Sequence, residues 1–182
     1  EKVVHNSIPL GSNGENAWNI EYQRDFDMAG DADKFRKITE FESKGFVKTR
    51  LGVWQHPDGQ TALPLYQGTM INILESNRAR WISGTGQSAK WNKDILRGSE
   101  FRPQYLISVA DVAIHRPNLL QARTSHSTVV LNLQDKSKQR ILARCLGGST
   151  NRRTSIVSPI PPFPSGHSAA SFITPTGMNG KY

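Results

Sequence analysis

Short apolar runs alternate with polar stretches that contain glycine and proline along most of the chain. The alternating Trp18, Ile20 and Tyr22 predict a strand, because successive strand side chains point to opposite faces. Apolar runs bounded by turn residues predict further strands over residues 46–54, 101–108, 129–131, 141–144 and 156–157. The prolines that follow residue 158 are incompatible with a helix or a central strand.

One short helix is predicted around residues 31–41, with Asp31 as its N-cap and Phe35, Ile38 and Phe41 along it. Residues 109–112 either end the strand before them or begin another short helix, and residues 83–89 are predicted to be a flexible loop. The whole pattern predicts an α+β fold, namely a β-rich mixed domain with short helices and long polar loops.

Residues 63–71 are an apolar run interrupted by Tyr66, Gln67 and Gly68. Pro64 favours an extended entry, and Gly68 permits backbone conformations that other residues resist. The pattern predicts a strand, a tight turn and then a second strand or packed segment.

Composition limits the classes of partner. A chain of 182 residues can bury one substantial core, so one domain is the default. The 23 Lys and Arg exceed the 15 Asp and Glu, and the formal charge of +8 favours a polyanion: nucleic acid, an acidic lipid surface or an acidic protein. No apolar run reaches membrane-spanning length and no signal-type segment starts the sequence, so we expect no membrane partner.

Cys145 is the only cysteine, which excludes an intrachain disulfide and favours a reducing, cytoplasmic location. We predict that it is a small, partly buried apolar residue, because no histidine lies beside it in the sequence to activate a nucleophile.

Residues 144–154 carry the most chemical information. They are basic, polar and glycine-rich between two apolar strands. Arginine offers a bidentate fork to guanine edges or phosphates, asparagine can pair with an adenine edge, and hydroxyl groups suit phosphate oxygens. The DNA-contacting side chains predicted here are Arg144, Ser149, Thr150, Asn151, Arg152, Arg153 and Thr154. The alternative is a solvated turn whose arginines hold phosphates or structure without reading bases.

Four motifs occur in an order that resembles the large adenine-N6 DNA methyltransferases, including those fused to restriction nucleases or found in phage-defence systems. The first comprises Trp18, Ile20, Tyr22, Phe26, Asp27, Met28, Asp31 and Phe35. Residues 63–71 resemble the family's passage into its target-recognition domain, with Gln67 and Thr69 replacing an acid and a lysine. The third comprises Pro103, Tyr105, Leu106 and Ile107.

The fourth motif comprises Arg144, Ser149, Thr150, Asn151, Arg153 and Thr154, followed by Ile156, Val157, Pro159, Pro161, Pro162 and Gly166. Cys145 stands where the family usually has an acid, which puts any ion pair of that acid in doubt. The resemblance adds Arg78, Arg80, Tyr66 and Gln67 as DNA-binding candidates.

The resemblance implies a target-recognition domain over residues 61–182 and a connector from an absent catalytic domain over residues 1–60, the two packed as one unit. It also implies sequence-specific binding of double-stranded DNA, with an attached methyltransferase domain as partner and S-adenosylmethionine bound in that domain. This chain would then have no catalytic residue, no cofactor and no metal of its own. The alternatives are a basic protein-interaction or structural module without DNA specificity, and a complete enzyme.

Other catalytic motifs are incomplete. Residues 84–91 resemble a phosphate-binding loop but lack its second glycine and its final hydroxyl. Residues 164–168 match one motif of the acid phosphatases related to phosphatidate phosphatase, without that family's other motifs. The histidines show no metal-ligand spacing. An Asn-Pro-Pro-Tyr motif and a glycine-rich turn for S-adenosylmethionine are missing too.

Overall fold

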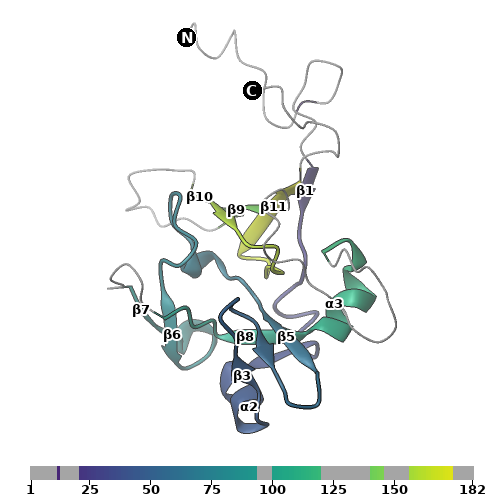
Figure 1. Ribbon diagram of the computed structural model, residues 1–182. Coiled ribbons are helices and arrows are strands. Elements are labelled where there is room, and N and C mark those ends of the chain that lie inside the picture. Colours follow the sequence, from purple (N-terminus) through teal and green to yellow (C-terminus); the bar gives the residue numbers. More distant parts are fainter. Residues whose placement is uncertain (1–11, 13–20, 94–99, 120–139, 146–155, 174–182) are drawn as a thin grey trace, which may run out of the picture.

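The computed structural model describes residue 12 and residues 21–93, 100–119, 140–145 and 156–173. Over these residues the protein is a β-rich mixed α+β fold with several sheets and a few short helices, which confirms the predicted class at that level. Figure 1 shows a four-stranded sheet at one end, a five-stranded sheet beneath it and helix α2 at the opposite end.

The four-stranded sheet has the order β1 (Glu21–Gln23), β11 (Ala169–Ile173), β9 (Arg140–Arg144) and β10 (Val157–Ile160), with every neighbouring pair antiparallel. In its register, Leu142 lies between Ser171 and Ser158. The edge position of β10 explains how Pro159 belongs to a strand, because proline can be tolerated where no neighbour needs its N–H.

The five-stranded sheet has the order β2 (Phe35–Lys37), β8 (Tyr105–Ser108), β5 (Thr61–Pro64), β4 (Trp54–Gln55) and β3 (Val47–Lys48), again antiparallel throughout. Leu63 lies opposite Ile107 in this register. Strands from either side of residue 60 pair with each other in both sheets, as β4 does with β5 and β1 does with β11.

Helices and a hairpin complete the described structure. They are α2 (Ile38–Ser43), α3 (Val109–His115), the 3-10 turns η1 (Gly68–Met70), η2 (Gly86–Ser88) and η3 (Pro117–Leu119), and the strands β6 (Arg80–Ser83) and β7 (Lys90–Asn92). Ser108 caps α3, because its Oγ accepts a hydrogen bond from the Asp111 N–H at 3.0 Å. Residues 109–112 therefore begin a helix. No helix in the described ranges is long and apolar enough to cross a membrane.

The core lies on both faces of the five-stranded sheet. One cluster fills the space towards the four-stranded sheet and includes Leu63, Ile107 and Leu142. The other lies on the opposite face and includes Leu106 and Trp54. Neighbouring residues of β8 thus enter different clusters, as expected when successive strand side chains alternate between faces.

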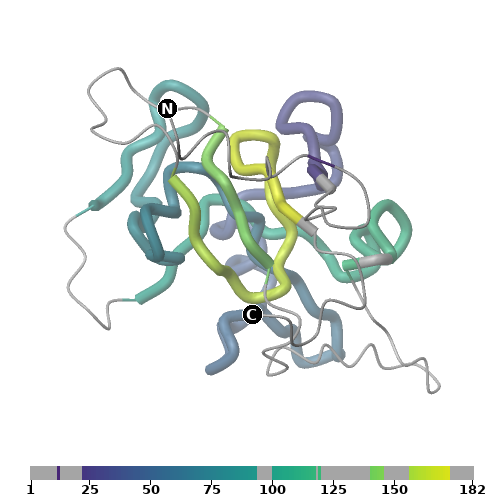
Figure 2. The backbone as a smooth tube through the Cα atoms, turned by 90° about the horizontal axis from the view of Figure 1, so that it is seen from above, coloured from purple at the N-terminus to yellow at the C-terminus, as the bar shows by residue number. Residues whose placement is uncertain are grey.

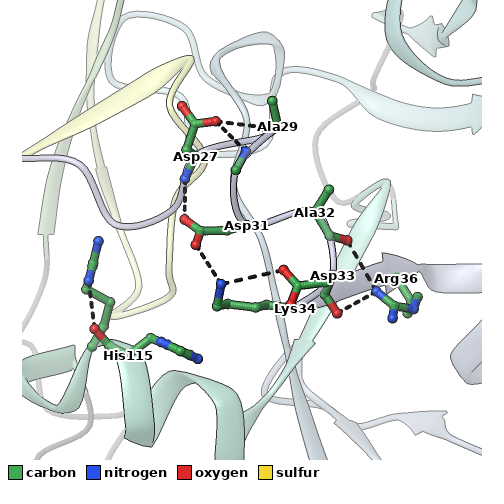
Figure 3. A network of polar contacts seen from close by, with 10 residues as sticks. Asp27, Ala29, Asp31, Ala32, Asp33, Lys34, Arg36 and His115 are labelled. Atoms are coloured by element: carbon green, nitrogen blue, oxygen red, sulfur yellow. Dashed lines mark hydrogen bonds and ion pairs between the residues drawn. The ribbon is translucent and has the colours of Figure 1, made fainter.

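Asp31 is not a helix N-cap, so the predicted helix around residues 31–41 is wrong in its first half. Its Oδ2 accepts from the Asp27 N–H at 2.8 Å and its Oδ1 lies 2.8 Å from the Lys34 Nζ, which closes a polar turn (Figure 3). The residues that follow pair with β8 as strand β2, and the helix begins only at Ile38. Pairing with a neighbouring strand has overridden the local helical pattern.

One predicted strand also needs correction. Residues 46–54 are not one strand: a turn separates β3 from β4, with Gly52 at φ +78 and the Thr49 N–H donating to the Val53 oxygen at 2.7 Å. Residues 83–89 form the closed end of the β6–β7 hairpin, where the Trp81 indole N–H donates to the Gly84 oxygen at 3.1 Å. Trp18, Ile20 and the strand predicted at residues 129–131 lie outside the described residues.

Candidate nucleic-acid interface

The segment after β5 leaves the five-stranded sheet and joins a loop that precedes β11. The Tyr66 N–H donates to the Pro164 oxygen at 2.8 Å, and the Gly166 N–H donates to the Tyr66 oxygen at 2.8 Å. These two bonds form a parallel bridge between Tyr66 and Ser165. The predicted strand over residues 63–64 is present. After it come the 3-10 turn η1 and the buried Met70 and Ile71, so the packed segment is the correct one of the two alternatives.

Tyr66 lies in the core. Tyr66 is only 3% exposed, and its ring centroid is 5.5 Å from that of Phe101 and 6.3 Å from that of Phe163. Burial raises the pKa of its phenol, because the phenolate would lose its hydration. Its ring therefore packs inside the protein in this structure, and a role of Tyr66 at DNA stays a prediction.

Gly68 packs tightly against Ser168 and Arg144. Its N–H donates to the Ser168 Oγ at 2.9 Å. A Cβ added at Gly68 would lie 2.5 Å from the Ser168 carbonyl oxygen and 3.2 Å from the Arg144 Cγ. Only glycine permits this contact, so the sequence at residue 68 brings β9 and η1 together.

Gln67 precedes this contact. Its backbone N–H lies 3.4 Å from the Met70 Sδ, and its backbone oxygen accepts from the Met70 N–H at 2.9 Å. Its side-chain Oε1 is buried and has no hydrogen-bond partner among the described residues. A buried amide oxygen without a donor is costly, and a ligand group or water that donates would relieve that cost.

Arg144 ends β9 at the point where the predicted recognition segment begins. Its N–H donates to the Ile156 oxygen at 2.9 Å, so the two chain ends that flank residues 146–155 are hydrogen-bonded to each other. The Cys145 N–H donates to the Ser168 oxygen at 3.0 Å. The remaining predicted residues of this segment lie outside the described residues: Ser149, Thr150, Asn151, Arg152, Arg153 and Thr154.

Cys145 is exposed, which corrects the expectation that it is partly buried. Its Sγ lies 3.9 Å from the Tyr22 Oη, across the intervening strand β11. The Arg24 Nε donates to the same hydroxyl at 3.2 Å, and this contact raises the pKa of the Arg24 guanidinium. The Arg24 guanidinium thus lies beside Tyr22, whose hydroxyl neighbours Cys145 at the end of β9. Figure 2 shows the backbone of this region from above.

Arg78 and Arg80 lie on the chain between η1 and the β6–β7 hairpin. The Arg78 N–H donates to the Met70 oxygen at 2.7 Å, and its Nη1 donates to the Lys93 oxygen at 2.6 Å. The Arg78 side chain stays 41% exposed, and its Nε is 4.0 Å from the Glu75 Oε2. Arg80 begins β6, opposite Asn92, and is half-buried. Arg78 thus has a structural role but keeps part of its surface in solvent.

A buried ion pair that the sequence analysis missed braces this region. Arg140 contacts both carboxylate oxygens of Asp25, at 2.7 and 2.9 Å, and its Nη1 also donates to the Phe163 oxygen at 2.8 Å. Asp25 accepts from both the backbone N–H and the hydroxyl of Ser165 at 2.8 Å. Asp25 is 0% exposed and Arg140 is 8% exposed, so these charges depend on each other.

The loop of residues 163–168 therefore holds the candidate site in place. It receives the ion pair at Ser165, Tyr66 at Pro164, and both Gly68 and Cys145 at Ser168. Part of its sequence, residues 164–168, is the incomplete phosphatase motif. The only signal that pointed to its structural role was the unusual density of proline and small residues after β10.

Within the described ranges, no group of three or more His, Cys, Asp or Glu side chains is arranged to hold a metal ion. No protein-family model, curated protein or solved structure matches the chain.

Proposed function

We propose that the chain is a sequence-specific recognition module for double-stranded DNA, the target-recognition part of an adenine-N6 DNA methyltransferase or restriction-modification enzyme. In this proposal an attached domain binds S-adenosylmethionine and performs the reaction, while this chain only binds. The proposal includes a cytoplasmic location, because the parent enzyme would act on DNA there.

The observation that carries the proposal is the contact between Gly68 and Arg144. The resemblance gave DNA-binding candidates in residues 63–71 and in residues 144–154, which are far apart in the sequence. A Cβ at Gly68 would lie 3.2 Å from the Arg144 Cγ. Residues 63–71 therefore pack against the first residue of the basic segment 144–154. A chain of net charge +8 with an arginine-rich segment flanked by hydrogen-bonded ends is suited to phosphate and base contacts.

The mechanism proposed is binding by two kinds of contact. Arginines near the contact between Gly68 and Arg144 neutralise phosphates, which supplies affinity without sequence information. Asn151 and Arg153 offer the side chains that pair with adenine and guanine edges in the major groove. The duplex is held while the attached domain takes up a target adenine flipped out of the stack.

The test uses the full chain and a pool of random duplexes, from which the bound sequences are selected and read. We expect an enriched motif, and affinity that falls steeply as salt rises, because each neutralised phosphate releases counterions. Asn151→Ala and Arg153→Ala should lower the enrichment of that motif about tenfold each, the cost of one good base contact. Fluorescence anisotropy with the motif and a scrambled duplex gives the same ratio in solution.

The matched control is Lys44→Ala, which also removes one positive charge. Lys44 is exposed after helix α2, at the opposite end of the molecule from the four-stranded sheet (Figure 1). It should change affinity less than about twofold, because exposed charges beyond a Debye length are screened. Absence of any selected motif, with duplex binding equal to that of a neutral protein, would contradict the proposal and favour a protein-interaction module.

A further inference from the structure

A tight turn over residues 72–75 projects beside the candidate interface. The Asn72 N–H donates to the Glu75 oxygen at 2.9 Å, and the Glu75 N–H donates to the Asn72 oxygen at 3.0 Å. The Asn72 Nδ2 also donates to the Glu75 Oε2 at 3.2 Å. Three hydrogen bonds between the two ends make this turn rigid, and they leave Ile73 and Leu74 at its tip.

Leu74 is unfavourably placed for a folded protein in isolation. Its φ is +56, the one positive value among the non-glycine residues that the structure describes. It is also 79% exposed, more than any other large apolar residue in those ranges. Glycine or asparagine is the usual residue at such a turn position, because a leucine side chain crowds the backbone there. Neither the backbone nor the core of this chain accounts for a leucine at residue 74.

The turn is fixed to the edge of the four-stranded sheet. The Leu74 N–H donates to the oxygen of Val157, the first residue of β10, at 2.9 Å. Val157 pairs with Ala143, the neighbour of Arg144, so the turn lies where residues 146–155 rejoin the sheet. Figure 1 shows this turn rising beside β10. At its base, Arg78 keeps a partly exposed guanidinium 4.0 Å from Glu75.

We propose that Leu74 is an apolar wedge that inserts between two stacked base pairs of the bound duplex. The inference rests on the proposed function and adds to it a residue that reads no base edge. The occupant has to offer both an apolar slot and negative charge. The exposed leucine belongs to a chain of net charge +8, with the partly exposed Arg78 at the base of its turn and Arg144 next to the partner of Val157. A base step between two phosphate chains has that chemistry, and apolar side chains of this kind kink the duplexes that they enter.

Rigidity makes the turn suitable for this task. A flexible loop would lose conformational entropy on insertion, whereas a turn closed by three hydrogen bonds has already lost it. The free energy gained by burying the leucine between bases then offsets part of the cost of unstacking them. The unfavourable backbone of Leu74 in the free protein is the strain expected of a residue retained for binding rather than for folding.

The test separates binding from folding through Leu74→Gly and Leu74→Asn. Both residues accept a positive φ, so the melting temperature should hold or rise by up to about 4 °C. Affinity for the duplex should nevertheless fall at least about fivefold, because the buried apolar side chain is gone. Energy transfer between dyes at the two ends of a duplex should report a kink of at least about 20° with the wild-type chain, and its loss in both variants.

Leu74→Phe keeps a large apolar wedge and should retain the kink. Ile114→Ala, which removes an exposed apolar side chain from α3, is the control and should leave affinity and bending unchanged. If the wild-type chain binds the duplex and Leu74→Gly binds and bends it equally well, the wedge is overturned and the proposed function still stands. Failure of the wild-type chain to bind any duplex overturns both.

Discussion

The two large sheets bury different chemistry. The five-stranded sheet packs apolar side chains on both faces, with Leu63 and Ile107 towards one cluster and Leu106 towards the other. Beneath the four-stranded sheet, by contrast, lie the buried charges of Asp25 and Arg140. Most of the buried polar residues of the described chain belong to this sheet or its loops: Asp25, Arg140, Ser158, Ser165 and Ser171.

The difference separates stability from positioning. Apolar packing has no preferred partner atom, so the five-stranded sheet is a general source of folding free energy. Ion pairs and hydrogen bonds fix direction and distance, and they hold residues 163–168 in the one arrangement that brings Gly68 to Arg144. The candidate interface lies on the polar sheet, where directional contacts position its residues more than they add to folding stability.

The largest expected effect comes from breaking the ion pair. Arg140→Ala should lower the free energy of unfolding by about 3–5 kcal/mol, because it leaves Asp25 as a buried charge without a cation. The double variant Asp25→Leu with Arg140→Met removes both charges and should recover most of this loss. Urea unfolding of the wild type and the two variants measures it, and a loss below about 1 kcal/mol in Arg140→Ala would show that the pair is not structural.

Leu106→Ala provides the comparison in the apolar sheet, with an expected loss of about 2–5 kcal/mol from the cavity. Because Leu106 lies in the cluster on the far face of the five-stranded sheet, its effect should add to that of Arg140→Ala. A large departure from additivity would mean that the two sheets do not behave as distinct regions.

An intermediate effect is expected where the two sheets meet. Gly68→Ala should destabilise the protein by about 1–3 kcal/mol, because its Cβ would lie 2.5 Å from a backbone oxygen of Ser168. The control is Gly30→Ala, whose Cβ would have no neighbour closer than 3.7 Å and should stay within about 1 kcal/mol of wild type. Thermal unfolding distinguishes the two, and equal melting temperatures would contradict the close approach.

The smallest effect concerns the polar turn that joins β1 to β2 (Figure 3). Hydrogen bonds from Lys34 and the Asp27 N–H lower the pKa of Asp31 from its ordinary 3.8. A carboxyl with a lowered folded pKa contributes stability above its unfolded pKa and loses it as the pH falls through the folded one. Asp31→Asn should therefore lose about 0.5 kcal/mol at neutral pH and match wild type at about pH 2.

Asp33→Asn is the matched control for this experiment, because Asp33 is 77% exposed and lies 3.5 Å from the same Lys34 Nζ. Its stability should follow wild type across the acid range. If Asp31→Asn also follows wild type at every pH, the turn does not help to join the two sheets.

The sequence predicted strands in both sheets: β5 and β8 in the apolar sheet, and β9 and β10 in the polar sheet. Apolar runs located β5 and β8, and the residues after β8 form the helix that was one of two alternatives for them. The errors arose where pairing between distant strands decided the outcome. Phe35 became part of β2 because β8 offers it a partner, and local capping signals around Asp31 carry no information about that partner.

In the polar sheet, strand β11 and the buried polar contacts were not predicted. The buried positions of this sheet include Arg140 and Ser171, which pattern reasoning assigns to the surface. The partners Asp25 and Arg140 are 115 residues apart, and neither stands out locally in a chain rich in charged residues. The residue types of the Arg144 segment were enough to predict it as a candidate site. The contacts that hold it in place join residues far apart in the sequence, so only the folded chain shows them.

The loop of residues 163–168 also has a consequence for the order of folding. Its bonds to Asp25 and Gly68 close separations of 140 and 100 residues, among the longest in the described structure. Contacts of such length are slow to form, because the chain must lose much of its freedom before they return any energy. We expect the five-stranded sheet to assemble first and the candidate interface last, so residues 163–168 must have left the ribosome before the interface can form.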